Sequence, residues 1–384
     1  MTYSSVHWTW TPLRSIPPVS FGVRRKLEIS RTIMKNDDIR SERTLLSAAA
    51  LLYLLFLVYL TVGLHFNMFG SDVLTYWAES LNWKTPFSTW WVPGYPLLLA
   101  AVRGITINVI PPIGIMVGIS AVSYLIAVST VFRLAIRNQF QYPFLLGLIF
   151  VLFPFVGLTY SVYPVADITA IALLLLAVSN LEKRRWVWFV IFSGASMIVQ
   201  KVMWFFVPPL VLVAFVKNKG SRMLLPYAFL PLFMWMGIGS IFHQDILWFM
   251  RWSYDNLFVS KSSMPIFDGL VTPLLSNSIE KIGKGILVAI VLLLTFISAH
   301  YSFRHKQWTG VCIAFSLFAM ITLVNSYEIW AVIRYSKLLV IPLSFVDIQS
   351  INCRSTFCFR LLALLILGTF VASNLAFGFY MARL

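Results

Sequence analysis

Apolar residues run along this chain in long unbroken stretches that are separated by short polar segments. Residues 45–64 and 286–299 are two such stretches, and neither shows the short-period alternation that is typical of a strand in a membrane barrel. A helix needs about 20 apolar residues to cross the hydrocarbon core of a bilayer. The pattern therefore predicts an all-α, polytopic integral membrane protein.

We expect about 11 transmembrane helices from these runs. They are placed at 45–64, 108–132, 142–160, 163–180, 186–200, 203–216, 223–242, 285–300, 309–324, 331–346 and 360–380. A further apolar stretch, 93–107, is short and opens with Pro93-Gly94, so we interpret it as an interfacial helix. Two longer connections, 65–92 and 243–284, carry aromatic and acidic residues and are predicted to be outer loops with a role beyond connecting spans.

Composition supports a membrane protein, because only 11% of the residues are charged and the mean hydropathy is +0.82. Soluble domains carry roughly 25% charged residues. The net charge of +16 would suit nucleic acid, but no basic stripe lies on a soluble domain, so we predict no nucleic-acid partner. The three cysteines, Cys312, Cys353 and Cys358, are expected to be free thiols.

The basic residues give an orientation, since cytoplasmic loops collect Lys and Arg. If 93–107 does not cross, most of the 30 basic residues share one side with the N-terminus. We therefore predict a cytoplasmic basic tail at 1–43 and a transmembrane domain at 44–384, with the active face extracytoplasmic. That face would be at the plasma membrane in a prokaryote or in the endoplasmic reticulum lumen in a eukaryote. Met34, just before a charged stretch, is an alternative start.

The acids point to the outer face. In this topology the acids on or near the outer side are Asp72, Glu79, Asp167, Asp245, Asp255, Asp268, Glu280 and Glu328. The first outer loop is predicted to hold a helix from Asp72 to about Trp83, with Ser71 as its cap. At about 100° per residue, one face would carry Asp72, Tyr76 and Glu79 toward an aqueous cavity. The opposite face, with Val73, Leu74, Trp77 and Leu81, would lie in the headgroup region. The alternative is that Asp72 only caps the helix.

Several short motifs resemble the GT-C superfamily of membrane glycosyltransferases, in its GPI-mannosyltransferase-like and uncharacterised prokaryotic branches. They are Ser71-Asp72…Tyr76, the aromatic and proline-rich stretch 90–98, Tyr160-Ser161-Val162-Tyr163-Pro164, and Glu328…Arg334-Tyr335…Pro342. The resemblance covers most of 45–346. It implies transfer of a sugar, with inversion, from a polyprenyl- or dolichyl-phosphate donor to a glycan, lipid or protein acceptor.

The resemblance implies a carboxylate that takes the proton of the acceptor hydroxyl. Asp72 is the candidate, and Glu79 further along the same helix is the reserve. Val73 follows Asp72, so the paired acids of some branches, which bind a metal, are missing at this point. None of the five His shows ligand spacing with acids or Cys, so we expect no resident metal or other cofactor, although a divalent metal stays open.

A departing lipid phosphate needs cationic donors. Arg334 is one candidate, with a pair to Glu328 as the alternative. Lys201 lies between two apolar runs, where a charge is costly and often functional, with snorkelling to the interface as the alternative. Arg103 would be a third phosphate contact or a headgroup anchor. Tyr76, Tyr163 and Tyr335 are candidates to contact the sugar or lipid, or they belong to an interfacial aromatic belt.

Two other functions stay open. A transporter or flippase for a lipid-linked or small substrate would show internal symmetry and broken helices near mid-membrane, and the sequence shows no such symmetry. An O-antigen polymerase- or ligase-like enzyme would rely on Arg and His in its outer loops rather than on an acid in the first loop.

Overall fold

The computed structural model describes residues 21–63, 71–81, 92–106, 109–152, 165–217, 222–248, 271, 273–323 and 334–345. The chain divides into two compact units, Met1–Thr44 and Leu45–Leu384. Helix α1 (Phe21–Val58) begins within the stretch that the sequence assigns to a polar tail and ends in a π-turn, η1 (Tyr59–Gly63).

Every regular element in the described residues is a helix, which confirms the all-α prediction. After η1 the chain forms α2 (Ser71–Leu81), α3 (Gly94–Ile105), α4 (Pro112–Arg137), α5 (Pro143–Leu152), α7 (Ala166–Glu182), α8 (Trp186–Val199), α9 (Met203–Lys217), the 3-10 helix η2 (Arg222–Phe229), α10 (Leu230–His243), α13 (Ile279–Arg304), α14 (Trp308–Leu323), the 3-10 helix η5 (Ser336–Leu339) and α16 (Val340–Leu343).

Four stretches in the described part of the chain are long and apolar enough to cross a membrane: Asp38–Val62, Pro112–Arg137, Arg222–His243 and Lys281–Arg304. The exposed side chains on these stretches are largely apolar. Leu55, Leu293 and Ile241, for example, are 56%, 57% and 78% exposed. Water would not favour this much exposed hydrocarbon, whereas lipid tails do. The protein is therefore an α-helical membrane protein.

The remaining predicted spans within the described residues match shorter helices. Helices α8 and α14, with 14 and 16 residues, are about 21 and 24 Å long. The predicted span 331–346 differs most from a regular α-helix, because its described part runs from the helical residues Arg334 and Tyr335 through the 3-10 helix η5 into the four-residue α16. Pro342 has no amide hydrogen to donate to the carbonyl of residue 338, which prevents a continuous α-helical ladder there. The predicted span 360–380 lies outside the described residues.

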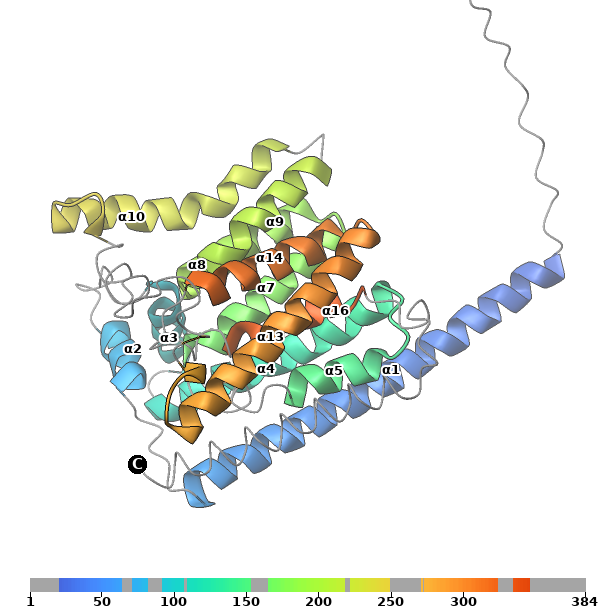
Figure 1. Cartoon of the computed structure of the whole chain (residues 1–384), viewed down its shortest axis with the longest axis horizontal. Helices are drawn as coiled ribbons and strands as arrows, with labels where there is room; N and C mark the ends of the chain where they lie inside the picture. Colours follow the sequence, from blue (N-terminus) through green and yellow to red (C-terminus); the bar gives the residue numbers. More distant parts are fainter. Residues whose placement is uncertain are drawn as a thin grey trace, which may run out of the picture. The chain divides into compact units, whose positions relative to one another are not determined.

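Helix α7 forms the centre of the second unit (Figure 1). It is apolar on all sides, and most of its residues from Ala166 to Leu181 are buried. Helices α4, α8 and α9 pack against it, and α14 packs against α9. A buried hydrogen bond of 3.1 Å joins Ser123 of α4 to Thr169 of α7. Small polar pairs of this kind are common between helices in membranes, where they satisfy each other without water.

The second unit's part of α1 buries one narrow stripe. Its buried residues follow one another at intervals of three or four and are all at most 8% exposed. They are Leu45, Ala49, Tyr53, Phe56 and Leu60. This spacing keeps a single face of the helix against its neighbours. The Tyr53 ring lies 5.5 Å from that of Tyr124 on α4, so the stripe packs on the bundle and the rest of the span is left for lipid.

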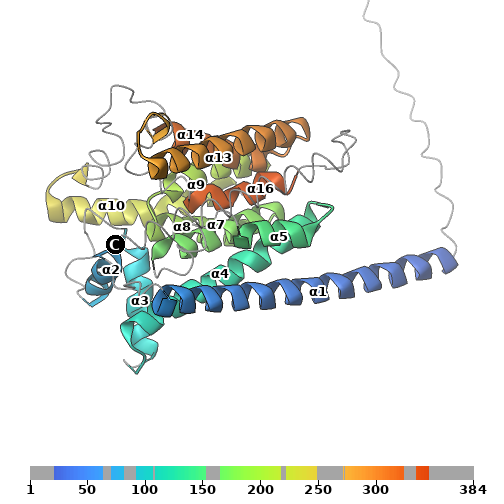
Figure 2. The ribbon, with the colours of Figure 1, turned by 60° about the horizontal axis from the view of Figure 1, so that its bottom comes forward.

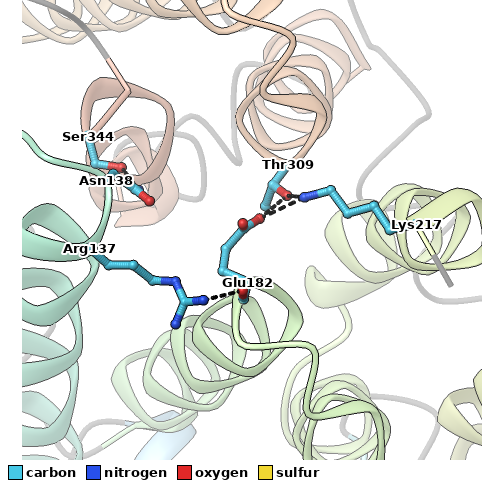
Figure 3. Close-up of polar contacts among 6 residues, drawn as sticks. All are labelled: Arg137, Asn138, Glu182, Lys217, Thr309 and Ser344. Atoms are coloured by element: carbon cyan, nitrogen blue, oxygen red, sulfur yellow. Dashed lines mark hydrogen bonds and ion pairs between the residues drawn. The ribbon is translucent and has the colours of Figure 1, made fainter. Parts of the chain in front are cut away.

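At one end of the bundle, Glu182 at the C-terminus of α7 joins several helix ends (Figure 3). Its Oε1 accepts hydrogen bonds from Lys217 of α9, at 3.1 Å, and from Thr309 of α14. Arg137 at the end of α4 donates to the carbonyl of Glu182. Nearby, Asn138 donates to Ser344 at 2.7 Å. The last turns of α4, α7 and α9 and the first turn of α14 therefore lie at one end of the bundle.

The opposite end of α7 begins with Asp167, about 22 Å from Glu182 along the helix axis. Helices α2 and α3 lie together at an end of the bundle in both views (Figures 1 and 2). Helix α3 packs on α8, and its first residues meet the last turn of α8. The short helices α2 and α3 are therefore gathered at the Asp167 end of the bundle.

Candidate functional site

Asp167 is a carboxylate in the first turn of the central helix α7 and is only 3% exposed. A buried charge is costly unless it is paired and hydrogen-bonded. Three side chains supply these partners. Tyr335 donates to Oδ1, Gln200 donates to Oδ1 at 3.2 Å, and Arg334 forms an ion pair with Oδ2 at 3.3 Å. The N-terminus of α7 adds the favourable end of the helix dipole.

Gln200 is held in the orientation that Asp167 requires. Its side-chain oxygen accepts a 2.9 Å hydrogen bond from the backbone N–H of Lys201, which leaves the amide nitrogen to face the carboxylate. Because the oxygen and nitrogen of a side-chain amide have opposite roles, this pair of bonds defines which way the amide lies. The turn between α8 and α9 is thereby fastened to the start of α7.

Arg334 and Tyr335 come from the segment that leads into η5. Tyr335 is buried, whereas the Arg334 side chain is 22% exposed. Arg334 binds Oδ2 of Asp167 and Tyr335 binds Oδ1, so these two neighbours in sequence share one acceptor. The structure gives Arg334 an acidic partner on α7, while the alternative partner from the sequence, Glu328, lies outside the described residues.

Lys201 lies in the turn between α8 and α9 and is 8% exposed. Its side chain is therefore largely covered by other described residues, and snorkelling to the interface stays the alternative. Burial lowers its pKa from 10.5 to about 8, because a charged ammonium loses its water there, and Glu79 of α2 acts in the opposite direction. Glu79 therefore lies close enough to Lys201 to favour its charged form.

A close contact between α3 and α8 fixes this geometry. A Cβ atom at Gly94 would lie 2.6 Å from the carbonyl oxygen of Ile198, which is backbone and has little freedom to move. Only glycine permits this approach. Ile198 is two residues before Gln200, so the contact at the start of α3 sets where the Gln200-Lys201 turn lies.

Helix α2 has the predicted position in sequence but ends at Leu81 and turns a different face inward. Tyr76 is buried as expected for a site residue, but so is Val73, which we had assigned to the headgroup face. Leu74 and Leu81 are 52% and 53% exposed and fit that face. The rotation has a cause: α2 packs on α3, with the rings of Tyr76 and Tyr95 edge to face at 5.0 Å.

Of the other predicted site residues, the structure describes the side chain of Arg103 but not those of Asp72 and Tyr163. Asp72 lies in α2 one turn, about 6 Å, before Tyr76, and its side chain is outside the described atoms. Tyr163 is outside the described residues altogether. Arg103 is in the last turn of α3, 6.0 Å from the ring centre of Trp77 of α2, so it contacts the neighbouring helix rather than the carboxylate of Asp167.

Sequence reasoning counted Asp167 among the outer acids but did not select it. The available signal was its position near the start of the apolar run 163–180, because an ionisable residue inside a span is a functional candidate by default. Its partners could not be found in this way, since Gln200, Arg334 and Tyr335 are distant in sequence.

The chemistry that the site can support depends on which of its charged side chains are already paired. Both oxygens of Asp167 already accept hydrogen bonds, so its carboxylate orients Arg334 rather than taking a proton from a substrate. Arg334 binds Asp167 directly, and the backbone of Lys201 is fastened to the same carboxylate through the Gln200 side chain, so two cationic residues belong to segments that meet there. Of the two, the Arg334 side chain is the more exposed. Such a pair suits an anionic group such as a phosphate. No group of three or more His, Cys, Asp or Glu that would hold a metal occurs among the described residues.

A scan against protein-family models finds no match for this chain. No curated protein matches it either.

Proposed function

We propose that this protein is a membrane glycosyltransferase that moves a sugar, with inversion, from a polyprenyl- or dolichyl-phosphate donor to an acceptor hydroxyl. The observation that carries the proposal is the convergence at one end of the bundle. Five residues selected from the sequence belong to segments that meet near the buried Asp167. Arg334 and Tyr335 bind its carboxylate, and Lys201 directly follows Gln200, which also binds it. Glu79 attracts Lys201, and Tyr76 of the same helix packs on Tyr95. The resemblance to GT-C enzymes supplies the reaction, and mannose is the sugar that its closest branch favours.

The donor's phosphate would bind Arg334 and Lys201. Arg334 is suited to this role because its guanidinium is preorganised by Asp167 and stays charged. The acceptor oxygen attacks the anomeric carbon from the opposite face as the bond from that carbon to the phosphate oxygen breaks. The bonding electrons leave with the phosphate, and the two cations stabilise the charge that develops there.

The acceptor hydroxyl must lose its proton in this step, and the proposed base is Asp72. Its helix, α2, places Tyr76 inside the site one turn further on. Glu79 is the reserve, but its electrostatic attraction to Lys201 favours a role in keeping that lysine charged. Asp167 is excluded as the base by its three donors.

We further propose eleven spans, a cytoplasmic N-terminus and an active face on the outer side. The distribution of helix ends supports this topology. Helix α3 meets α8 near Gln200 with its first residue and leads on to the start of α4, the opposite end of that helix from Arg137. An α3 that returns to the side on which it began is an interfacial helix.

The direct test follows labelled sugar in proteoliposomes that contain purified protein, a polyprenyl-phosphate sugar and acceptor. Wild-type protein should release polyprenyl phosphate and transfer label in equal amounts. Asp72→Asn should stop transfer, while Ala78→Ser, a change on an exposed position of the same helix, should leave it intact. Donor movement across the bilayer with its phosphodiester intact, unaffected by Asp72→Asn, would refute the proposal.

That refuting outcome would favour the second candidate, a transporter or flippase for a lipid-linked substrate. One observation speaks for it: the described segment 334–345 departs from regular α-helix, with a 3-10 stretch between Tyr335 and α16. Broken helices are common at transporter binding sites. An irregular helix also brings polar residues such as Arg334 and Tyr335 into a site within a membrane protein. We prefer this interpretation, because it agrees with the proposed transferase.

A further inference from the structure

At the Glu182 end of the bundle, opposite the candidate active site, five exposed cations form what we call the basic cluster. It consists of Arg133, Arg137, Lys183, Arg184 and Arg185. Arg133 and Arg137 are one turn apart on α4, and the other three form the turn between α7 and α8. Arg137 joins the two groups by its hydrogen bond to the carbonyl of Glu182 (Figure 3).

The basic cluster is crowded. Partial burial lowers the pKa of Lys183, and the charges of Arg185, Arg137 and Arg133 lower it further. Glu182 supplies one negative charge, but its Oε1 already accepts hydrogen bonds from Lys217 and Thr309. Like charges held this close destabilise one another, so an anion that lies between them would relieve the repulsion.

Exposed apolar surface leads up to the basic cluster on two helices. On α4, Val122 and Ile126 are 59% and 39% exposed and lie on the same helical face as Arg133. On α8, exposed Val187, Trp188 and Ile191 begin two residues after Arg185. A ligand that covers both features has an anionic head and hydrocarbon chains.

We propose that the basic cluster is a binding site for the phosphate headgroup of an anionic lipid, whose acyl chains lie along the exposed faces of α4 and α8. Each element of the ligand has a counterpart. The phosphate would bind Arg and Lys side chains from two helix ends. Trp188 is exposed three residues after Arg185, and such aromatic rings prefer the headgroup boundary. This site is separate from the one proposed for catalysis, because α7 holds the two at its opposite ends.

The test measures the association of spin-labelled phosphatidic acid and spin-labelled phosphatidylcholine with the purified protein in bilayers. Phosphatidic acid should be preferred by wild-type protein. Lys183→Gln with Arg185→Gln should lower its relative association by about 5-fold or more. The matched control is Arg304→Gln with Lys306→Gln, and it should keep the preference. These two exposed cations lie at the end of α13 and in the turn that follows it, at the same end of the bundle.

Three results would overturn the site. One is equal association of the two lipids with wild-type protein. Another is an equal loss in both double variants, which would indicate diffuse charge attraction. The third is displacement of the lipid by inorganic pyrophosphate at unchanged ionic strength, which would assign the cluster to a soluble phosphate. Should the cluster variant fail to fold, Arg133→Gln, an exposed position on α4, provides the same comparison.

Discussion

Arg334 and Asp167 form an ion pair at 3.3 Å, although they lie far apart in sequence. The carboxylate is buried and the guanidinium is partly exposed, so the pair extends from the centre of the bundle toward its surface. In the proposed mechanism, Asp167 is therefore the positioning residue and Arg334 is the group that binds the donor's phosphate.

Removal of the carboxylate should therefore cost both stability and donor binding. Asp167→Asn leaves Arg334 and Tyr335 without their acceptor charge, and loss of one partner of a buried ion pair costs about 3–5 kcal/mol. The double variant Asp167→Asn with Arg334→Gln should be less unstable than the two single changes added together, by about 1–3 kcal/mol. Thermal unfolding in detergent measures both values. Strict additivity would show that the pair is not an energetic unit.

Lys201 predicts an unusual pH dependence. Its pKa is lowered to about 8, so the ammonium loses its proton near that pH and donor binding should decline as pH rises through it. Lys201→Arg should keep binding at higher pH, because a guanidinium stays protonated. Titration of donor affinity against pH for both proteins checks this, and identical profiles would remove Lys201 from the binding site.

The expected fall in donor binding at high pH would not be caused by unfolding of the protein. The folded protein holds the Lys201 proton less tightly than the unfolded chain, whose lysine has the ordinary value of 10.5. The unfolded chain therefore binds more protons between pH about 8 and 10.5, and this residue's contribution to stability rises with pH in that window. Stability and donor binding should change in opposite directions.

The contact at Gly94 gives a prediction about the support of the site. Gly94→Ala places a methyl group 2.6 Å from the Ile198 carbonyl, so α3 and α8 must separate, at a cost of about 1–3 kcal/mol, and the Gln200-Lys201 turn should shift with them. Gly104→Ala is the matched control, since a Cβ there meets nothing within 4 Å. Its expected effect is a small gain in helix stability. Unfolding temperature and transfer rate should fall for the first variant alone.

Cysteine labelling from each side of the membrane tests whether α3 crosses. In a protein whose native cysteines are replaced by Ser, cysteines at Ala78 and Val109 should be labelled from one side and a cysteine at Gln139 from the other. All three positions are exposed. If α3 crossed the bilayer, Ala78 and Val109 would lie on opposite sides.

The sequence is a good guide to features that depend on local pattern. Long apolar runs predict an all-helical membrane protein, and the loop around Tyr76 and Glu79 predicts the helix α2. Lys201, Arg334 and Tyr335 could be selected because charged and polar groups next to apolar runs are costly and therefore informative.

What the sequence could not give depends on packing between distant segments. Helix α2 packs on α3 through Tyr76 and Tyr95, and Val73, one turn before Tyr76, is buried with it. Asp167 could be noticed from the sequence, but its role depends on Gln200, Arg334 and Tyr335. The 3-10 stretch η5, just before Pro342, lies in what the sequence shows as a continuous apolar run. Hydropathy measures only how apolar the side chains are, so it does not report the amide hydrogen that proline lacks.

One comparison tests the central claim most directly: donor binding and sugar transfer measured side by side in Asp72→Asn and Arg334→Ala. The proposed division of labour predicts that Asp72→Asn binds the polyprenyl-phosphate sugar like wild type and transfers none, whereas Arg334→Ala loses affinity for it. Undiminished transfer by Asp72→Asn, or undiminished donor affinity in Arg334→Ala, would contradict the account.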